Sequence, residues 1–177
     1  MFWNMHDGTF KDVSKLAGAA VEIPQVSRGL ACGDLFNDGH IELVVENLEG
    51  EPMILRSEAD PRHHWIAFQL AGTKSNRLAL NARVHVAAGN LIQMDEVRSG
   101  GSYMSQNDLR LHFGLGDHDK ADRVEIAWPS GASMTLTNLA ADRLYCVQEG
   151  SGVVPCASIR PVRQPAVPDP RAQGLRR

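Results

Sequence analysis

The chain has 177 residues, of which 43% are hydrophobic and 22% charged, and its formal net charge is −3. Such a composition is typical of a globular protein that can bury a substantial core. Acids and bases are interspersed, so the sequence has no basic stripe for binding nucleic acid, and no apolar run is long enough to span a membrane as a helix. We therefore expect no nucleic-acid partner and no transmembrane segment.

The first residues, MFWNMHDGTF, lack the basic and apolar regions of a secretory signal, so we expect no signal peptide within this chain. The segment that follows, KDVSKLAGAA, could form a helical turn that ends at Gly18. No other segment suggests a helix. Helices therefore do not organise the predicted fold.

Short runs of alternating apolar and polar residues, bounded by turn residues, predict strands along the rest of the chain. They lie at 41–48, 65–70, 82–88, 109–113, 123–128 and 143–147. In three of these runs alternate residues share one apolar face: Ile66, Phe68 and Leu70; Leu109, Leu111 and Phe113; Val124, Ile126 and Trp128. Turn sequences at 89–90 and 129–131 favour antiparallel pairing. The sequence thus predicts an all-β fold, an antiparallel β-sandwich or partial barrel.

A polar segment with a proline at 57–63 predicts a boundary between residues 1–56 and residues 62–150. The remaining residues, 151–177, contain five of the nine prolines and five arginines, and we expect them to form a disordered tail. The three cysteines lie at wide spacings without a metal-binding pattern. We expect Cys32 and Cys146 to be small core residues, although a Cys146–Cys156 disulfide remains open in an oxidising compartment.

The stretch GDLFNDGHIE, residues 33–42, has the spacing of a calcium loop, with acidic residues at its first, fifth and ninth ligand positions around a glycine. A weakly bound calcium ion would be held by Asp34, Asp38, the carbonyl of His40 and Glu42. The third ligand position is Phe36, which has no side-chain oxygen. The alternative is a tight turn without metal, in which Asp34, Asn37 and Asp38 accept hydrogen bonds from loop amides. The flanking runs suggest strands, and Val45 cannot serve as the twelfth ligand, so the loop is not an EF-hand.

The most polar stretch, SGGSYMSQND at 99–108, could suggest catalysis. Ser102, however, lacks the second glycine of a nucleophile elbow, and no histidine or acid is spaced to complete a triad. We expect Ser105, Gln106 and Asp108 to bond loop amides, with Tyr103 packed over them. The seven histidines form no metal pattern, and His85 and His112 occupy outward strand positions, which predicts surface histidines.

The segments HHWIAFQLAGTKSNR, ARVHVAAGN, EVRSGGSYMSQNDLRLHFGLG and VEIAWPSGASMTLTNL closely resemble the ASPIC/UnbV domain, which is also found at the end of cartilage acidic protein. This resemblance covers nearly all of residues 63–150. Upstream, WNMHDGTFKDVSKLAG and RGLACGDLFNDGHIELVVENL resemble an FG-GAP or VCBS repeat, which forms a blade of a β-propeller. Leu78 and Asn81 depart from the ASPIC/UnbV pattern, which tends to have an acid and a glycine there.

The resemblance implies that residues 1–56 are a single propeller-blade fragment in front of an ASPIC/UnbV-like β domain. A single blade has little core of its own, because each blade packs between two neighbours. The expected partners are therefore missing propeller blades or another protein or glycan surface. The resemblance implies a non-enzymatic, calcium-associated interaction module outside the cell or at its surface, in adhesion or assembly. The alternative is an enzyme or enzyme-accessory domain that uses the Ser99–Asp108 loop.

Overall fold

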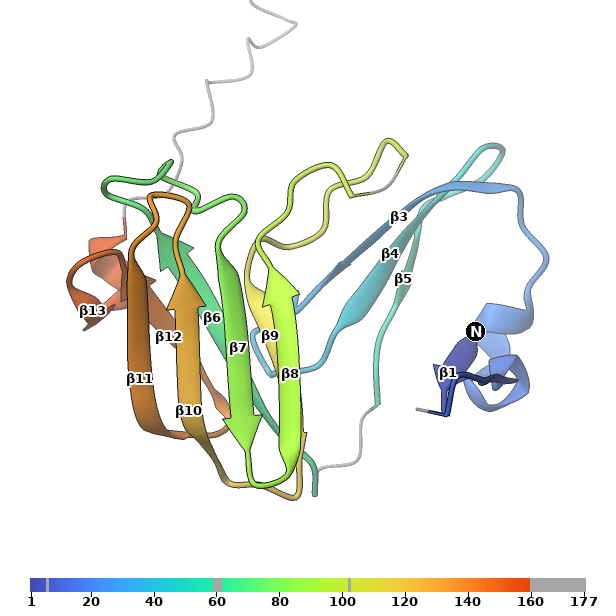
Figure 1. Cartoon of the computed structure of the whole chain (residues 1–177). Coiled ribbons are helices and arrows are strands. Elements are labelled where there is room, and N and C mark those ends of the chain that lie inside the picture. Colours follow the sequence, from blue (N-terminus) through green and yellow to red (C-terminus); the bar gives the residue numbers. More distant parts are fainter. Residues whose placement is uncertain (6, 59–61, 102, 160–177) are drawn as a thin grey trace, which may run out of the picture.

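The computed structural model describes residues 1–5, 7–58, 62–101 and 103–159. Two four-stranded sheets pack face to face and form a β-sandwich, with the orders β11-β10-β7-β8 and β13-β12-β6-β9 (Figure 1). Their strands are β6 (His64–Ala71), β7 (Arg83–Ala88), β8 (Leu91–Glu96), β9 (Leu111–Gly116), β10 (Lys120–Ala127), β11 (Ser133–Ala140), β12 (Arg143–Gln148) and β13 (Gly152–Val154). The prediction of an all-β, sandwich-like fold is confirmed.

One strand pair departs from the antiparallel pattern. β12 pairs with β6 in parallel, with Arg143 opposite Ile66 and Gln148 opposite Ala71. Parallel neighbours need a long connection, and here the chain crosses to the other sheet for β7 and β8, returns for β9, and crosses again for β10 and β11 before β12. The sequence pattern does not reveal this pairing, because strand periodicity carries no information about direction.

The core of the sandwich lies between the two sheets and uses the faces that the sequence predicts. Ile66, Phe68 and Leu70 on β6 are buried, as are Val124, Ile126 and Trp128 on and after β10. On β9 the buried face continues to Leu115, which is fully enclosed, whereas Leu109 precedes the strand and is partly buried. These apolar side chains belong to one cluster that spans both sheets.

The N-terminal part consists of separate small elements. A hairpin pairs β1 (Phe2–Asn4) with β2 (Phe10–Asp12), and two short 3-10 helices follow, η1 (Ser14–Leu16) and η2 (Ala19–Glu22), where the sequence suggests a helical turn. A three-stranded antiparallel sheet then forms from β3 (Ser27–Gly33), β4 (Glu42–Asn47) and β5 (Met53–Leu55). We call this the N-terminal sheet; it lies beside the sandwich in Figure 1.

The described residues of the N-terminal part form no apolar core of their own. Every buried hydrophobic residue in the described part of the chain lies between Ile66 and Val147. By contrast, nine large apolar side chains of the N-terminal part are more than half exposed: Phe2, Trp3, Phe10, Leu16, Ile23, Val26, Phe36, Leu48 and Ile54. The described residues therefore form one complete core, in the sandwich, beside a set of N-terminal strands whose apolar side chains are largely exposed.

The end of the sandwich corrects the predicted boundary at residue 150. β13 pairs with β12, and a 3-10 helix η3 (Cys156–Ser158) follows. A disulfide joins Cys146 on β12 to Cys156. Residues 152–158 therefore belong to the sandwich and not to a disordered tail; residues 160–177 lie outside the described residues. Sequence periodicity missed β13 because the strand has only three residues.

Candidate functional site at the junction of the N-terminal sheet and the sandwich

The polar 99–108 loop of the sandwich covers the outer edge of β3. The N–H of Leu30 donates to Ser105 Oγ at 2.9 Å, and the N–H of Cys32 donates to Asn107 Oδ1 at 3.0 Å. The carbonyl of Cys32 accepts the N–H of Asp108 at 2.9 Å. An exposed strand edge presents unpaired backbone groups that invite association. The loop satisfies these groups and fastens the N-terminal sheet to the sandwich.

This arrangement partly corrects the expectation for the loop. Gln106 does accept a loop amide, that of Gly100. Ser105 Oγ, however, accepts the N–H of Leu30 on β3 instead of a loop amide. Tyr103 is exposed and does not pack over the loop. Ser102, the residue considered as a nucleophile, lies outside the described residues.

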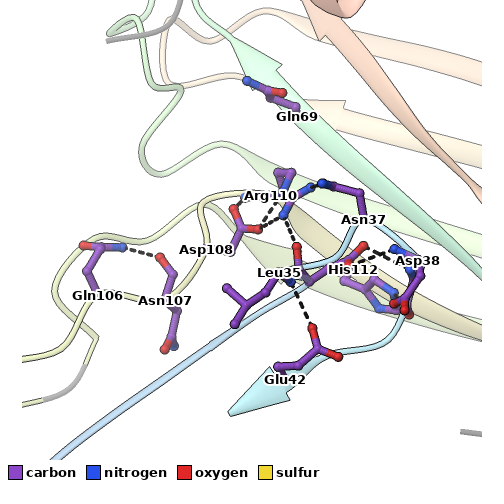
Figure 2. Close-up of polar contacts among 12 residues, drawn as sticks. Leu35, Asn37, Asp38, Glu42, Gln69, Gln106, Asn107, Asp108, Arg110 and His112 are labelled. Carbon is purple, nitrogen blue, oxygen red and sulfur yellow. Dashed lines mark hydrogen bonds and ion pairs between the residues drawn. The ribbon is translucent and has the colours of Figure 1, made fainter. Parts of the chain in front are cut away.

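Arg110, just before β9, makes the most extensive polar connection across the junction (Figure 2). Its Nε donates to Asp108 Oδ2, its Nη1 to Asn37 Oδ1 and its Nη2 to the carbonyl of Asp34, each at 2.6 Å. Charge-assisted hydrogen bonds of this length are among the stronger polar contacts in proteins. The planar guanidinium group therefore fixes the 34–42 loop to β9 at two points.

His112 on β9 contacts the same loop and is not a surface histidine. Its Nε2 lies 2.7 Å from the carbonyl of Gly39, and its ring stacks on Trp65 with centroids 5.4 Å apart. Burial lowers the pKa of His112, outweighing the opposite effects of the Gly39 hydrogen bond and of the Asp34 charge. The outward position on β9 was correctly predicted, but the 34–42 loop covers that face.

The carboxylates of the 34–42 loop bond mainly to its own backbone. Asp34 accepts the N–H groups of Asp38 and Gly39 at 3.1 and 3.0 Å, and Glu42 accepts the N–H of Leu35 at 2.9 Å. Asp38 Oδ1 accepts the N–H of His40 at 3.1 Å, and its pKa is lowered chiefly by this bond. Asp34 and Asp38 therefore accept hydrogen bonds from loop amides, as expected for the turn without metal.

A calcium ion fits this loop poorly. In the part of the chain that the structure describes, no three His, Cys, Asp or Glu side chains are grouped so that they could hold a metal. Phe36 supplies no oxygen and is about half exposed. One feature favours a ligand: Glu42 is fully buried, and its Oε1 has no hydrogen-bond partner among the described residues. Calcium binding at Asp34, Asp38, His40 and Glu42 stays a prediction.

A cavity of about 310 Å³ lies within the junction. Its wall includes Cys32 and Asp34 from the N-terminal part and Trp65, His112 and Arg143 from the sandwich. Burial raises the pKa of the Cys32 thiol, the opposite direction from the lowered pKa of a reactive cysteine. The described residues of the junction thus connect the N-terminal sheet to the sandwich through hydrogen bonds and ring stacking.

Comparison with known families agrees with the fold of the sandwich. Residues 72–154 match the family model described as ASPIC and UnbV. The match includes β13, in agreement with the end of the sandwich described above. Comparison with curated proteins finds no match for the chain. The resemblance of residues 1–56 to FG-GAP or VCBS repeats gains no support from these findings and stays a prediction.

The ASPIC and UnbV match is consistent with a non-enzymatic module of the extracellular type. No helix in the described ranges has both the length and the apolar character needed to cross a bilayer. Sequence reasoning did not identify the residues that build the junction, Trp65, Asn107, Arg110 and His112. A signal was present in the density of polar residues at 105–112, but without the neighbouring sheet their partners could not be assigned.

Proposed function

We propose that the chain is a non-enzymatic interaction module in which the sandwich holds the N-terminal sheet in a fixed position and presents it to a further β-rich unit. The difference between the two edges of the N-terminal sheet carries this proposal. The sandwich covers the β3 edge through Ser105 and Asn107. Among the described strands, β5 pairs only with β4, so its other edge is available to a partner.

The surface around β5 has the chemistry of an interface. A groove of about 680 Å³ lies between the two 3-10 helices and β4–β5, and its apolar wall includes Leu16, Val21, Leu43 and Ile54. Contiguous exposed apolar surface of this kind marks interaction sites in proteins. An added strand would pair with β5 while its neighbours cover these side chains. The partner we propose is therefore a set of propeller blades, in the same protein or in another polypeptide.

The predicted extracellular location has support of its own. The Cys146–Cys156 disulfide connects β12 to η3. Disulfides form and persist mainly in oxidising compartments such as the cell exterior. We propose adhesion or assembly outside the cell or at its surface as the setting. We propose no catalytic role for the 99–108 loop, because Ser105, Asn107 and Asp108 are used to hold β3.

The test is co-expression of the chain with the polypeptide encoded directly upstream of it, followed by affinity purification and hydrogen exchange. Ile54→Lys places a charge at the centre of β5, and Ile92→Lys is the matched control, because Ile92 is also exposed on an edge strand of the sandwich. The proposal expects that Ile54→Lys abolishes co-purification and that Ile92→Lys does not. Binding should slow amide exchange over residues 53–58. Equal binding by both variants would contradict the proposed surface.

A further inference from the structure

The 34–42 loop has the form of a calcium loop, yet other groups take the oxygens that calcium would need. Asp34 accepts two backbone N–H groups, and Glu42 accepts the N–H of Leu35. Calcium takes six to eight oxygen ligands. Of the six carboxylate oxygens of Asp34, Asp38 and Glu42, Glu42 Oε1 is the one without a partner among the described residues, and even with the carbonyl of His40 it falls far short of that number. The question is then what balances the negative charge of the loop.

Arg56, directly after β5, provides one positive charge on the outer side of the loop. Its Nη2 lies 3.2 Å from Asp38 Oδ2. The guanidinium carbon lies 4.7 Å from the centre of the Phe36 ring, within the range of a cation–π contact. Phe36 therefore does more than remove a ligand from the third position, because its ring supports the cation that pairs with Asp38.

Arg110 provides a second guanidinium group, whose charge is paired with Asp108 outside the loop. It donates to one side-chain oxygen and one carbonyl oxygen of the loop, those of Asn37 and Asp34. Carbonyl and side-chain amide oxygens are also the neutral ligands that calcium uses. A guanidinium group is always charged, and its planar fork of five N–H donors can bond several oxygens at once.

We propose that Arg56 and Arg110 are tethered cations that replace a metal ion in the 34–42 loop. Arg56 supplies a positive charge beside Asp38, and Arg110, itself paired with Asp108, supplies contacts to the neutral oxygens of Asn37 and Asp34, so the loop reaches its structure without calcium. One cation comes from the N-terminal sheet and the other from the sandwich. The loop is therefore held by the junction itself, and its order does not depend on the calcium concentration. This inference does not rest on the identity of the partner of β5.

The experiment measures hydrogen exchange at the amides of Asp38, Gly39 and His40, whose N–H groups are bonded within the loop. The full chain is treated with a chelator and compared with and without millimolar calcium, with Arg56→Gln as the test variant. Arg83→Gln is the matched control, because the Arg83 side chain is as exposed as that of Arg56 and also pairs with one carboxylate, but lies outside the loop.

The expected result is that calcium leaves exchange in the native chain unchanged. Arg56→Gln should speed exchange at the three amides by about threefold to tenfold, from the loss of one exposed ion pair and one cation–π contact. Arg83→Gln should leave these amides unchanged. Slower exchange of the native loop in calcium would overturn the proposal, and so would equal exchange rates at these amides in the two variants.

Discussion

The indole ring of Trp65 lies directly against the backbone of Gly39, so closely that the 34–42 loop has room for no side chain at this position. A Cβ added to Gly39 would lie 2.0 Å from both Cε2 and Nε1 of Trp65. Gly39 also has φ of 87°, a conformation that favours glycine. The contact seats the loop on the sandwich, because Trp65 on β6 stacks in turn on His112 of β9.

Gly39→Ala should therefore open the junction without unfolding the sandwich. We expect a loss of about 2 to 4 kcal/mol in the stability of the docked N-terminal sheet, from overpacking and backbone strain together. Hydrogen exchange of β3 and β4 amides measures this opening. Gly8→Ala is the control, because Gly8 has nearly the same φ, 88°, with no atom near an added Cβ. Equal effects of the two substitutions would show that the Trp65 contact is unimportant.

Acid should weaken the junction through His112. Burial lowers the pKa of this residue in the folded state, and nearby Arg110 and His40 lower it further, against the opposing effects of the bond with Gly39 and the Asp34 charge. The docked state thus binds a proton less readily than the open state. The contribution of neutral His112 to the stability of the docked state is complete above about pH 6.5, and it is lost as the pH falls towards the pKa of His112 in the folded state.

Denaturation followed at about pH 7.5 and pH 5.5 should show this loss, since stability rises with pH wherever the open state binds more protons. His112→Gln keeps a donor for the carbonyl of Gly39 but does not titrate, so its pH dependence in this range should be shallower. An identical slope in the native chain and in His112→Gln would assign the pH dependence to other groups.

Glu149 should stabilise the sandwich at neutral pH by ordering the loop after β6. Burial raises its pKa, but hydrogen bonds from Ser130, Ser75 and Thr73 outweigh this effect and lower the pKa to about 2. Because the folded pKa lies below the unfolded one, the stabilisation is complete above about pH 4.5 and is lost as the pH falls towards 2. Glu149→Gln should lower the melting temperature at pH 7 and reduce the difference between pH 7 and pH 3. An unchanged acid transition would refute this role.

Trp128→Ala should destabilise the sandwich by about 3 to 5 kcal/mol, the usual cost of removing a large aromatic side chain from a core. Trp128 is 4% exposed and belongs to the cluster between the two sheets. Urea denaturation monitored by circular dichroism measures the change. Trp3→Ala is the control, because Trp3 is 62% exposed on β1 and should cost little. A loss below about 1 kcal/mol for Trp128→Ala would contradict the described core.

Ser105→Ala and Asn107→Ala should loosen the β3 edge by about 1 kcal/mol each, the typical net value of a hydrogen bond. Each substitution removes the acceptor of one β3 amide, that of Leu30 or Cys32. Exchange at these two amides should accelerate while the sandwich amides keep their rates. Unchanged exchange at Leu30 and Cys32 would show that the 99–108 loop does not protect this edge.

The sandwich could be predicted from sequence because its strands bury one face each, and burial leaves a period of two. Val124 and Ile126 on β10 illustrate this: both are buried, and they alternate with the exposed Arg123, Glu125 and Ala127. The junction could not be predicted in the same way. His112 looks like an outward residue on its own strand, and only the position of the 34–42 loop, which depends on contacts far apart in sequence, shows that it is covered.

The 34–42 loop shows a second limit of sequence reasoning. The regularly spaced acids Asp34, Asp38 and Glu42 predict a cation, but their spacing cannot tell whether that cation is a metal or a side chain from elsewhere in the chain. Arg56 follows Asp38 by 18 positions, and Arg110 lies 73 positions after Asn37. Neither pairing leaves a local pattern. In the sequence, Phe36 indicates that the loop differs from a calcium loop, because it places a side chain without oxygen at the third ligand position.

The parallel pairing of β6 and β12 has a mechanical consequence. Because the two strands run in the same direction, the chain enters this pair at His64, and the Cys146–Cys156 disulfide transfers a pull from the residues after η3 to Cys146, opposite Gln69. Tension between the N-terminal sheet and the residues after η3 would pull the two strands past each other along their length. The hydrogen bonds of the pair from Arg143 to Cys146 would then resist the force together, in shear, instead of opening one after another. A module placed between a neighbouring unit and an attachment point would transmit pulling forces through this pair before it unfolds.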